Sequence, residues 1–234
     1  MQHTNLIVPG FHGGGEAHWP TWLERRLDNV RRVRGIAWEA PLLARWAAAV
    51  RREIDESPHA VWIVAHSFGG LASVVAATDR PDKVAGMLLV APTDPECFSP
   101  LGVRDEVGAA HSGSVAASLP VAPFGCASSV VASSDDSWVS LTVAARWAER
   151  WGSDCIELGP AGHINIESGH GPWPLGFESL QAMQHAQEDF PHGTIGEPCL
   201  SRRGRHGALA RIRHRTRFVF NRQAAGRDRP TPEG

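Results

Sequence analysis

Three kinds of side chain in this sequence could together carry out nucleophilic catalysis: a serine, a carboxylate and a histidine, in that chain order. The serine is Ser67, the carboxylate is Asp135 or Asp136, and the histidine is His163. A serine hydroxyl is a weak nucleophile until a base takes its proton, and the base needs a carboxylate to orient it. The set predicts attack by a serine on a carbonyl carbon, provided that the fold brings the three groups together.

The segment around Ser67 has the pattern of a sharp turn between a strand and a helix. The apolar run Val61–Val64 precedes the serine, and the small, apolar run Phe68–Thr78 follows it. A serine on such a turn projects its hydroxyl from the carboxyl end of the sheet, and its flanking positions must be small. Ala65 and Gly69 meet that requirement, with alanine in place of the first glycine of the usual G-x-S-x-G. The alternative is a serine that only caps an ordinary helix.

The predicted acid and base follow two later strands. Ser129–Ala132 leads into the loop with Asp135 and Asp136, and Cys155–Leu158 leads into the loop with His163. Ligand sites in parallel sheets lie outside the carboxyl ends of the strands, so both loops should face the serine. The residues alone leave open which of the two aspartates is the acid.

Other histidines compete for these roles or for a metal. His66 lies on the strand side of the turn, and we expect it to point away from the site. His170 either lines the same opening or forms a structural hydrogen bond within its loop. No H-E-x-x-H or C-x-x-C motif occurs, and the histidines lack zinc-ligand spacing, so we expect no metal.

The glycine-rich loop after the first predicted strand, Pro9–Gly15, can approach a substrate oxygen closely. We predict that the backbone N–H groups of Phe11 and Phe68 form the oxyanion hole, with His12 as the alternative donor to Phe11. His12 and Trp138 are also the predicted substrate-binding residues. The loop is not a phosphate loop, because no Gly-Lys-Ser/Thr follows it. It is not a dinucleotide fingerprint either, because its glycines do not have the G-x-G-x-x-G spacing.

Strand and helix patterns alternate along the chain and predict an α/β fold, with a mainly parallel six-stranded sheet, helices on both faces and a minimal lid. The predicted strands are Leu6–Val8, Val33–Ala37, Val61–Val64, Val84–Val90, Ser129–Ala132 and Cys155–Leu158. The predicted helices are Trp19–Leu27, Leu42–Ile54, Phe68–Thr78 and Leu141–Trp151. The weakly patterned segment Thr93–Ala122 is too short for a large lid.

Composition limits the class of protein. Of 234 residues, 42% are hydrophobic and 21% are charged, which is typical of a globular domain. The longest apolar runs have the length of strands, so no membrane span is expected. The first residues show no secretory pattern, and the four cysteines are widely separated. These features favour a reduced, cytosolic protein.

The charge is distributed unevenly. Residues 200–234 contain ten of the 23 basic residues and two of the 25 acidic ones, so the tail is basic and the body acidic. We predict a hydrolase-like domain over residues 1–190 and an arginine-rich, poorly ordered tail over residues 191–234. The tail could instead be an arm for nucleic acid or anionic lipid, or an artefact of reading frame. The acidic body is not typical of a nucleic-acid-binding protein.

The motifs together resemble a known family. Val8-Pro9-Gly10, His18-Trp19, the serine turn, Ser134-Asp135-Asp136, Gly162–Asn165 and Gly169–Pro174 are similar to small YdeN-like α/β-hydrolases, relatives of retinoblastoma-binding-protein-like serine hydrolases. The likeness spans roughly residues 5–180. It implies a lid-poor domain with Ser67, Asp136 and His163 as the triad, and it leaves Asp135 to cap the turn. The motif L-x-C-x-E is absent, so no retinoblastoma-protein partner is implied.

We therefore expect a serine hydrolase that cleaves carboxylic esters, or amides, of small molecules through an acyl-enzyme, without metal or cofactor. Trp19, Trp138, Trp173 and Phe11 either form the wall of an apolar acyl pocket or belong to the core. The rival interpretation is a binding or scaffold protein that keeps the fold without turnover.

Overall fold

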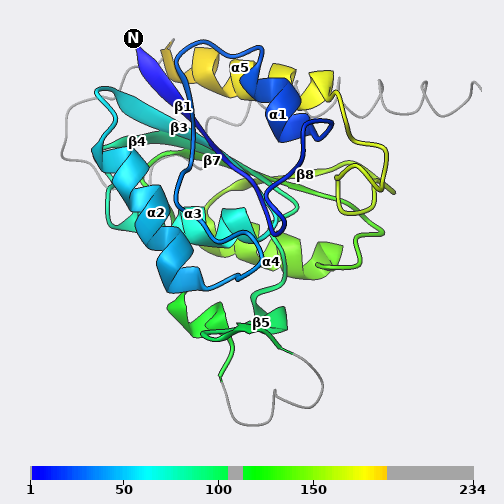
Figure 1. Ribbon diagram of the computed structural model, residues 1–234. Coiled ribbons are helices and arrows are strands. Elements are labelled where there is room, and N and C mark those ends of the chain that lie inside the picture. Colours follow the sequence, from blue (N-terminus) through cyan, green and yellow to red (C-terminus); the bar gives the residue numbers. More distant parts are fainter. Residues whose placement is uncertain (1, 105–112, 189–234) are drawn as a thin grey trace, which may run out of the picture. The chain divides into compact units, whose positions relative to one another are not determined.

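Six parallel strands form the central sheet of the computed structural model, which describes residues 2–104 and 113–188 of the unit Met1–Pro191 (Figure 1). The spatial order is β2-β1-β3-β4-β7-β8. The strands are β1 (His3–Val8), β2 (Val30–Arg32), β3 (Ala60–His66), β4 (Val84–Val90), β7 (Ala127–Ala132) and β8 (Asp154–Glu157). The strand β2 lies on one side of β1, and β3 and all later strands of this sheet lie on the other side. The predicted tail, residues 191–234, lies outside the described residues and stays a prediction.

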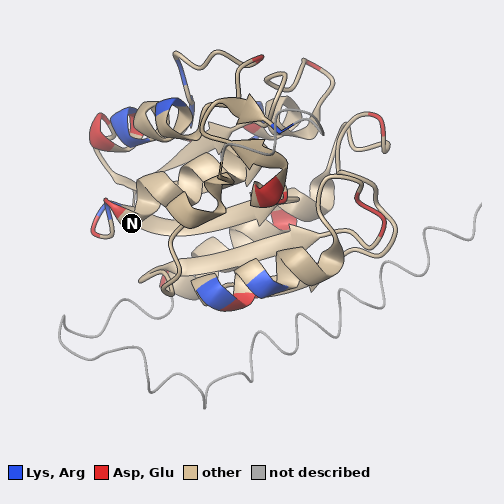
Figure 2. Cartoon of the chain, turned by 90° about the horizontal axis from the view of Figure 1, so that it is seen from below, with Lys and Arg blue, Asp and Glu red and all other residues tan. Residues whose placement is uncertain are grey.

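The four inner strands carry no charged residue, whereas both edge strands do (Figure 2). Strands covered on both faces rarely carry charged side chains, because each face packs on a layer of helices. Edge strands face solvent on one side, where charges also discourage pairing with another chain. The charge pattern therefore follows the position of each strand in the sheet.

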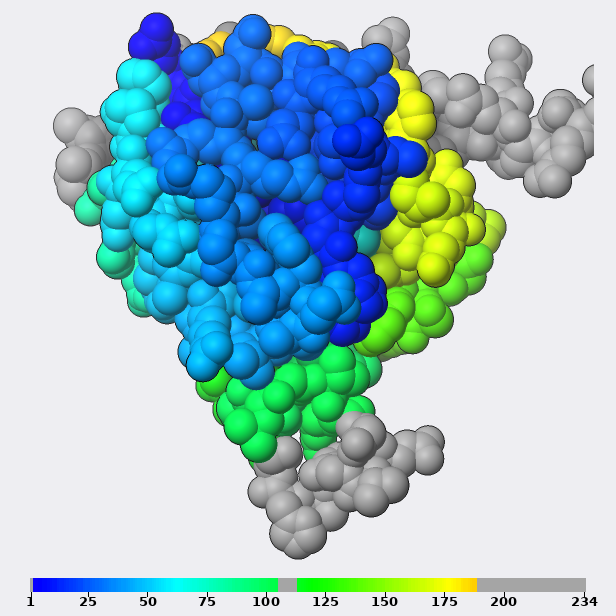
Figure 3. Space-filling view, in the orientation of Figure 1, coloured from blue at the N-terminus to red at the C-terminus, as the bar shows by residue number. Residues whose placement is uncertain are grey.

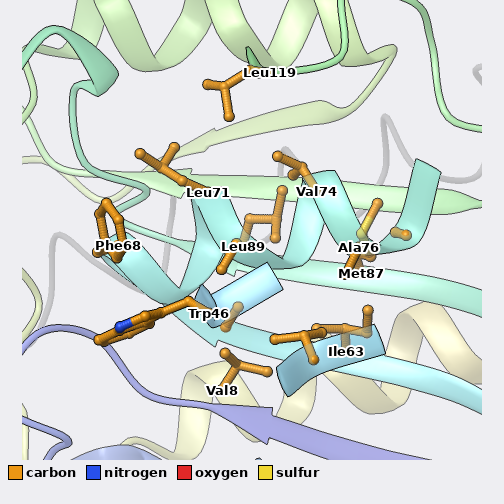
Figure 4. Close-up of a cluster of buried hydrophobic side chains, with 14 of the residues drawn as sticks. Val8, Trp46, Ile63, Phe68, Leu71, Val74, Ala76, Met87, Leu89 and Leu119 are labelled. Carbon is orange, nitrogen blue, oxygen red and sulfur yellow. The ribbon is translucent and has the colours of Figure 1, made fainter. Parts of the chain in front are cut away.

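Helices cover both faces, as predicted. On one face lie α2 (Leu43–Asp55), α3 (Phe68–Thr78) and α4 (Leu141–Trp151), and on the other lie α1 (Trp19–Glu24) and α5 (Pro174–Glu188) (Figure 1). In the first layer, the rings of Trp46 and Phe68 meet edge to face at 5.1 Å between α2 and α3 (Figure 4). The sheet thus separates two cores, and α3 contributes to the larger one.

The predicted second strand, Val33–Ala37, was wrong in position. The structure has β2 at Val30–Arg32, paired in parallel with β1. Two of its three residues are arginines, so it lacks the apolar pattern by which strands are recognised. Arg31 is satisfied outside the sheet, because its guanidinium bonds to the buried carboxylate of Glu53 at 2.7 Å. Val33, just after the strand, is the buried residue that produced the misplaced prediction.

The segment between β4 and β7 contains only short elements in its described part. These are the 3-10 helices η1 (Pro95–Cys97) and η3 (Val115–Ser118) and the antiparallel strands β5 (Phe98–Ser99) and β6 (Gly102–Val103). The rest of the predicted lid region, residues 105–112, lies outside the described residues. The helix α5 had no counterpart among the predicted helices. Within the described ranges no helix is long and apolar enough to cross a membrane.

Candidate active site

Ser67 sits on a strained turn between β3 and α3. Its backbone has φ 54° and ψ −130°, a left-handed region that residues with a Cβ rarely adopt. Such a conformation costs on the order of 1–3 kcal/mol and persists only where the surroundings enforce it. A Cβ at Gly69 would overlap the carbonyl oxygen of Pro9 and lie 2.6 Å from that of Val8, so only glycine fits there. The end of β1 and the start of α3 therefore lock the serine in place.

The structure brings the predicted serine, histidine and one aspartate into a hydrogen-bonded chain. The Oγ of Ser67 lies 2.8 Å from His163 Nε2. The other ring nitrogen of His163, Nδ1, lies 3.0 and 2.9 Å from the two carboxylate oxygens of Asp136. The carboxylate is fully buried and the histidine side chain is one-tenth exposed. A carboxylate acceptor at Nδ1 leaves Nε2 free to take a proton from the serine.

Asp135 and Asp136 are neighbours in sequence but bond to different partners. Asp136 bonds to the ring of His163, while Asp135 accepts the backbone N–H groups of Ala161 at 2.8 Å and Gly162 at 2.7 Å. The Ser133 hydroxyl also donates to Asp135 at 2.7 Å. That hydroxyl, followed by the Gly162 N–H, lowers the pKa of Asp135. Asp135 thus secures the loop before His163, and Asp136 contacts the ring itself.

Two backbone N–H groups remain open beside the serine. Among the described residues the N–H of Phe11 has no hydrogen-bond partner, and that of Phe68 lies at the first position of α3, where no intrahelical acceptor exists. The N–H of His12, the alternative donor, is already bonded to the carbonyl of Trp38 at 3.2 Å. A Cβ at Gly10 would lie 2.7 Å from Ser67 Cβ, so this loop runs directly beside the nucleophile. The geometry favours the pair Phe11 and Phe68.

The two predicted substrate-binding residues lie at the surface. Trp138 is 37% exposed, and its ring centroid is 6.1 Å from that of His163. The His12 side chain is exposed and bonds to Glu39 at 2.8 Å. Trp19 and Trp173 are buried against each other, 5.1 Å between ring centroids, so their place is in the core. Of the four aromatic residues predicted for an acyl pocket, Trp138 and the half-buried Phe11 remain candidates for a wall against substrate.

His66 contradicts the expectation that it points away from the site. Its Nε2 lies 2.9 Å from the backbone carbonyl oxygen of His163, and the two rings are 4.9 Å apart. Burial, and next the charge of His163, keep the pKa of His66 well below its usual range. His66 is therefore a neutral ring in direct contact with the segment that carries the predicted base.

Two further histidines complete the cluster. His18, which the sequence singled out only within the family likeness, is 6% exposed and lies 5.1 Å from the His66 ring. Its Nδ1 has no hydrogen-bond partner in the described structure, and burial lowers its pKa to about 4. The Nδ1 of His170 lies 3.2 Å from the Ser168 hydroxyl, as expected for a structural loop histidine. Within the described residues, no group of His, Cys, Asp and Glu side chains could hold a metal ion.

A surface cavity of about 400 Å³ lies between η1, η3 and α4. Its lining includes Arg146, Trp147 and Arg150 but none of the three residues of the hydrogen-bonded chain. Its wall contacts the loop that carries Asp136, because the backbone N–H of Asp94 donates to the carbonyl of Trp138 at 3.0 Å. The Ser67 residue itself is 6% exposed.

The comparisons with known proteins concern the family and the fold of the chain. The family described as serine hydrolase matches residues 5–182. A protein from Pectobacterium atrosepticum described as a YdeN-like hydrolase is 31% identical over 79% of this chain and 92% of that chain, with a TM-score of 0.68. The ydeN gene product of B. subtilis is 18% identical over 79% of this chain and all of that chain, with a TM-score of 0.59.

A third solved structure shares the fold at lower identity. Est1E of Butyrivibrio proteoclasticus, bound to ferulic acid, is 16% identical over 80% of this chain and 90% of that chain, with a TM-score of 0.59. No curated protein sequence matches the chain.

Proposed function

Because the chain belongs to the serine hydrolase family, within the YdeN-like α/β-hydrolases, we propose that it cleaves carboxylic esters through an acyl-enzyme intermediate, with Ser67, His163 and Asp136 as catalytic triad. The observation that carries the proposal is the unbroken hydrogen-bonded chain from the serine hydroxyl to a buried carboxylate. A strained serine at its head supports the same conclusion, since backbone strain concentrates at functional positions.

In the first step, Ser67 Oγ forms a bond to the carbonyl carbon of the ester while its proton passes to His163 Nε2. The tetrahedral intermediate then expels the alcohol as the ester C–O bond breaks, and the alcohol takes the proton from His163. Water attacks the acyl-enzyme with His163 again as base, which releases the acid and restores Ser67. No electron transfer and no co-reactant other than water is required.

Asp136 holds the histidine in the tautomer with hydrogen on Nδ1 and stabilises the imidazolium that forms in each step. The backbone N–H groups of Phe11 and Phe68 donate to the oxygen that becomes negative in the tetrahedral intermediate. These groups are fixed before substrate arrives, because one lies on a loop pressed against Ser67 and the other begins α3. Trp138 offers an apolar surface to the acyl or alcohol portion.

The test is a panel of p-nitrophenyl esters of increasing acyl length, with one p-nitroanilide to test amides. Wild type should hydrolyse at least one ester, and Ser67→Ala should lower kcat by about 10³–10⁶-fold. The matched control is Ser73→Ala, because Ser73 is a buried serine in the helix that follows Ser67 and its hydroxyl donates to the Gly69 carbonyl. It should retain activity within about threefold. Full activity in Ser67→Ala, or no turnover of any member by wild type, would count against the proposal and favour a non-catalytic binding protein.

A further inference from the structure

The turn that carries His163 has a positive φ on both sides of that residue, and one of the two positions is strained. Gly162 has φ 55° and Ile164 has φ 49°. Glycine adopts such angles freely, but a β-branched residue does so at a cost of roughly 1–2 kcal/mol. Ile164 is also fully buried. A conformation of this kind persists only where neighbouring groups enforce it.

Two buried rings bond to successive carbonyls of this turn. His66 Nε2 lies 2.9 Å from the carbonyl oxygen of His163, and the Trp19 indole Nε1–H donates to the carbonyl oxygen of Ile164 at 2.8 Å. A carbonyl only accepts, so Nε2 of His66 must carry the hydrogen. The two rings also contact each other edge to face, with centroids 5.7 Å apart. Together they form a pair of donors, which we call the carbonyl clamp.

Both members of the clamp come from elements fixed elsewhere in the fold. Trp19 is the first residue of α1, and that N-terminal segment (blue) lies against the segment after β8 (yellow) on the face drawn in Figure 3. His66 is the last residue of β3 and directly precedes Ser67. The same strand end therefore carries the nucleophile and bonds to the backbone of the base.

The His66 ring also suits its electrostatic surroundings. It is neutral, because burial and the neighbouring histidines hold its pKa well below the usual range. When His163 becomes positively charged during acyl transfer, a neutral donor adds no second positive charge nearby. The adjoining His18 ring has a pKa of about 4 and is neutral too.

We propose, on the premise of the function proposed above, that His66 and Trp19 are positioning residues: the carbonyl clamp holds the strained turn and thereby sets the distance between His163 Nε2 and Ser67 Oγ. Neither side chain takes part in proton transfer. A displacement of about 1 Å in such a pair can lower the rate by about 10²-fold, so loss of the clamp should appear in kcat rather than in KM.

The test uses two substitutions at His66, one that keeps a donor and one that removes it, and one substitution at Trp19. His66→Gln places an amide N–H where Nε2 stands, and His66→Leu removes the donor at similar volume. Trp19→Phe removes the indole N–H but keeps an aromatic ring. We expect kcat for p-nitrophenyl acetate to fall about 10–100-fold in His66→Leu and about tenfold in Trp19→Phe, with KM within about twofold. In His66→Gln kcat should recover to within about threefold of wild type.

A purely structural role would lower the melting temperature without changing kcat per folded molecule, and that result would overturn the proposal. A His66→Gln variant no more active than His66→Leu would overturn it as well. If His66→Leu does not fold, Trp19→Phe and His66→Gln decide the matter by the same criteria.

A second readout does not depend on turnover. The hydrogen shared by His163 Nδ1 and Asp136 should give a downfield proton NMR signal, assigned by its loss in His163→Ala. It should be sharp in wild type and His66→Gln and broadened or shifted in Trp19→Phe. An unchanged signal in Trp19→Phe would overturn the clamp. Absence of ester turnover by wild type would instead count against the proposed function alone, so the two failures are distinguishable.

Discussion

The turns that carry Ser67 and His163 are both strained, yet they are held in different ways. The serine turn is held by close backbone packing, because Gly69 presses against the end of β1 and Gly10 against Ser67 itself. The histidine turn is held by hydrogen bonds to its backbone from three side chains: His66, Trp19 and Asp135. The serine turn therefore requires residues without a Cβ at the two glycine positions. The histidine turn requires side chains that donate or accept hydrogen bonds.

At the histidine turn, the largest effect should come from one of the two neighbouring aspartates, Asp136. Asp136→Asn leaves His163 with the wrong tautomer, and kcat should fall by about 10³–10⁴-fold. In Asp135→Asn the side-chain carbonyl can still accept the N–H groups of Ala161 and Gly162, so kcat should fall less than about tenfold. Steady-state kinetics of both variants on one p-nitrophenyl ester measure the difference. The reverse order would transfer the role of triad acid to Asp135.

Gly69→Ala tests the packing that holds the serine turn. The added Cβ would meet backbone carbonyl oxygens of Pro9 and Val8, which cannot move aside as a flexible side chain would. We expect the free energy of unfolding to fall by about 3 kcal/mol, measured by urea denaturation. Gly125→Ala is the control, since a Cβ there meets nothing within 4 Å, and it should change stability by less than about 0.5 kcal/mol. Equal effects of the two substitutions would show that close packing does not hold this turn.

The serine turn was predictable from sequence because its requirements are local. A strand, a serine between small residues and a helix follow one another within a short stretch, and each is visible in the residue types. The parallel sheet was equally predictable, since each of its inner strands contains a run of three or more apolar residues. The position of the edge strand β2 could not be predicted from apolar residues, because two of its three residues are arginines. The Arg31 side chain bonds to Glu53 outside the sheet, so this strand does not need an apolar pattern.

The carbonyl clamp could not be predicted in the same way. Trp19 and Ile164 are 145 residues apart, and His66 and His163 are 97 apart. Nothing in the residue types at those positions indicates that a ring N–H meets a backbone carbonyl. The resemblance to the family singled out the motif His18-Trp19 without a structural explanation. The structure explains Trp19, because α1 packs against the segment after β8 and the indole N–H reaches the carbonyl of Ile164.

The buried histidines give the smallest expected effect, on stability at acidic pH. In the unfolded chain each histidine takes up a proton near pH 6.5, whereas burial keeps His66 and His18 neutral in the fold to much lower pH. Below about pH 6.5 the unfolded chain binds more protons than the folded protein, so the free energy of unfolding falls as the pH decreases. Above that pH both histidines are neutral in the folded and the unfolded state, and they no longer affect stability. The groups that face His66 are His163, His18 and His170.

The substitution His66→Gln keeps an N–H donor for the His163 carbonyl but removes the titratable imidazole of His66. Between pH 7 and 5.5 wild type should lose about 1 kcal/mol more of its free energy of unfolding than the variant loses. Urea denaturation at the two pH values measures it, and subtracting the variant cancels the carboxylates, which titrate in both proteins. Identical pH dependence in the two proteins would mean that His66 is protonated in the fold or neutral in the unfolded chain.

The role of Ser67 is tested most directly by peptide mapping after reaction with a fluorophosphonate, which forms a covalent bond only with an activated serine hydroxyl. The adduct should lie on Ser67 in wild type and in Ser73→Ala, and it should be missing from Ser67→Ala. Asp136→Asn should react far more slowly. A protein that shows no adduct at Ser67, or that reacts equally well after Ser67→Ala, would contradict the triad.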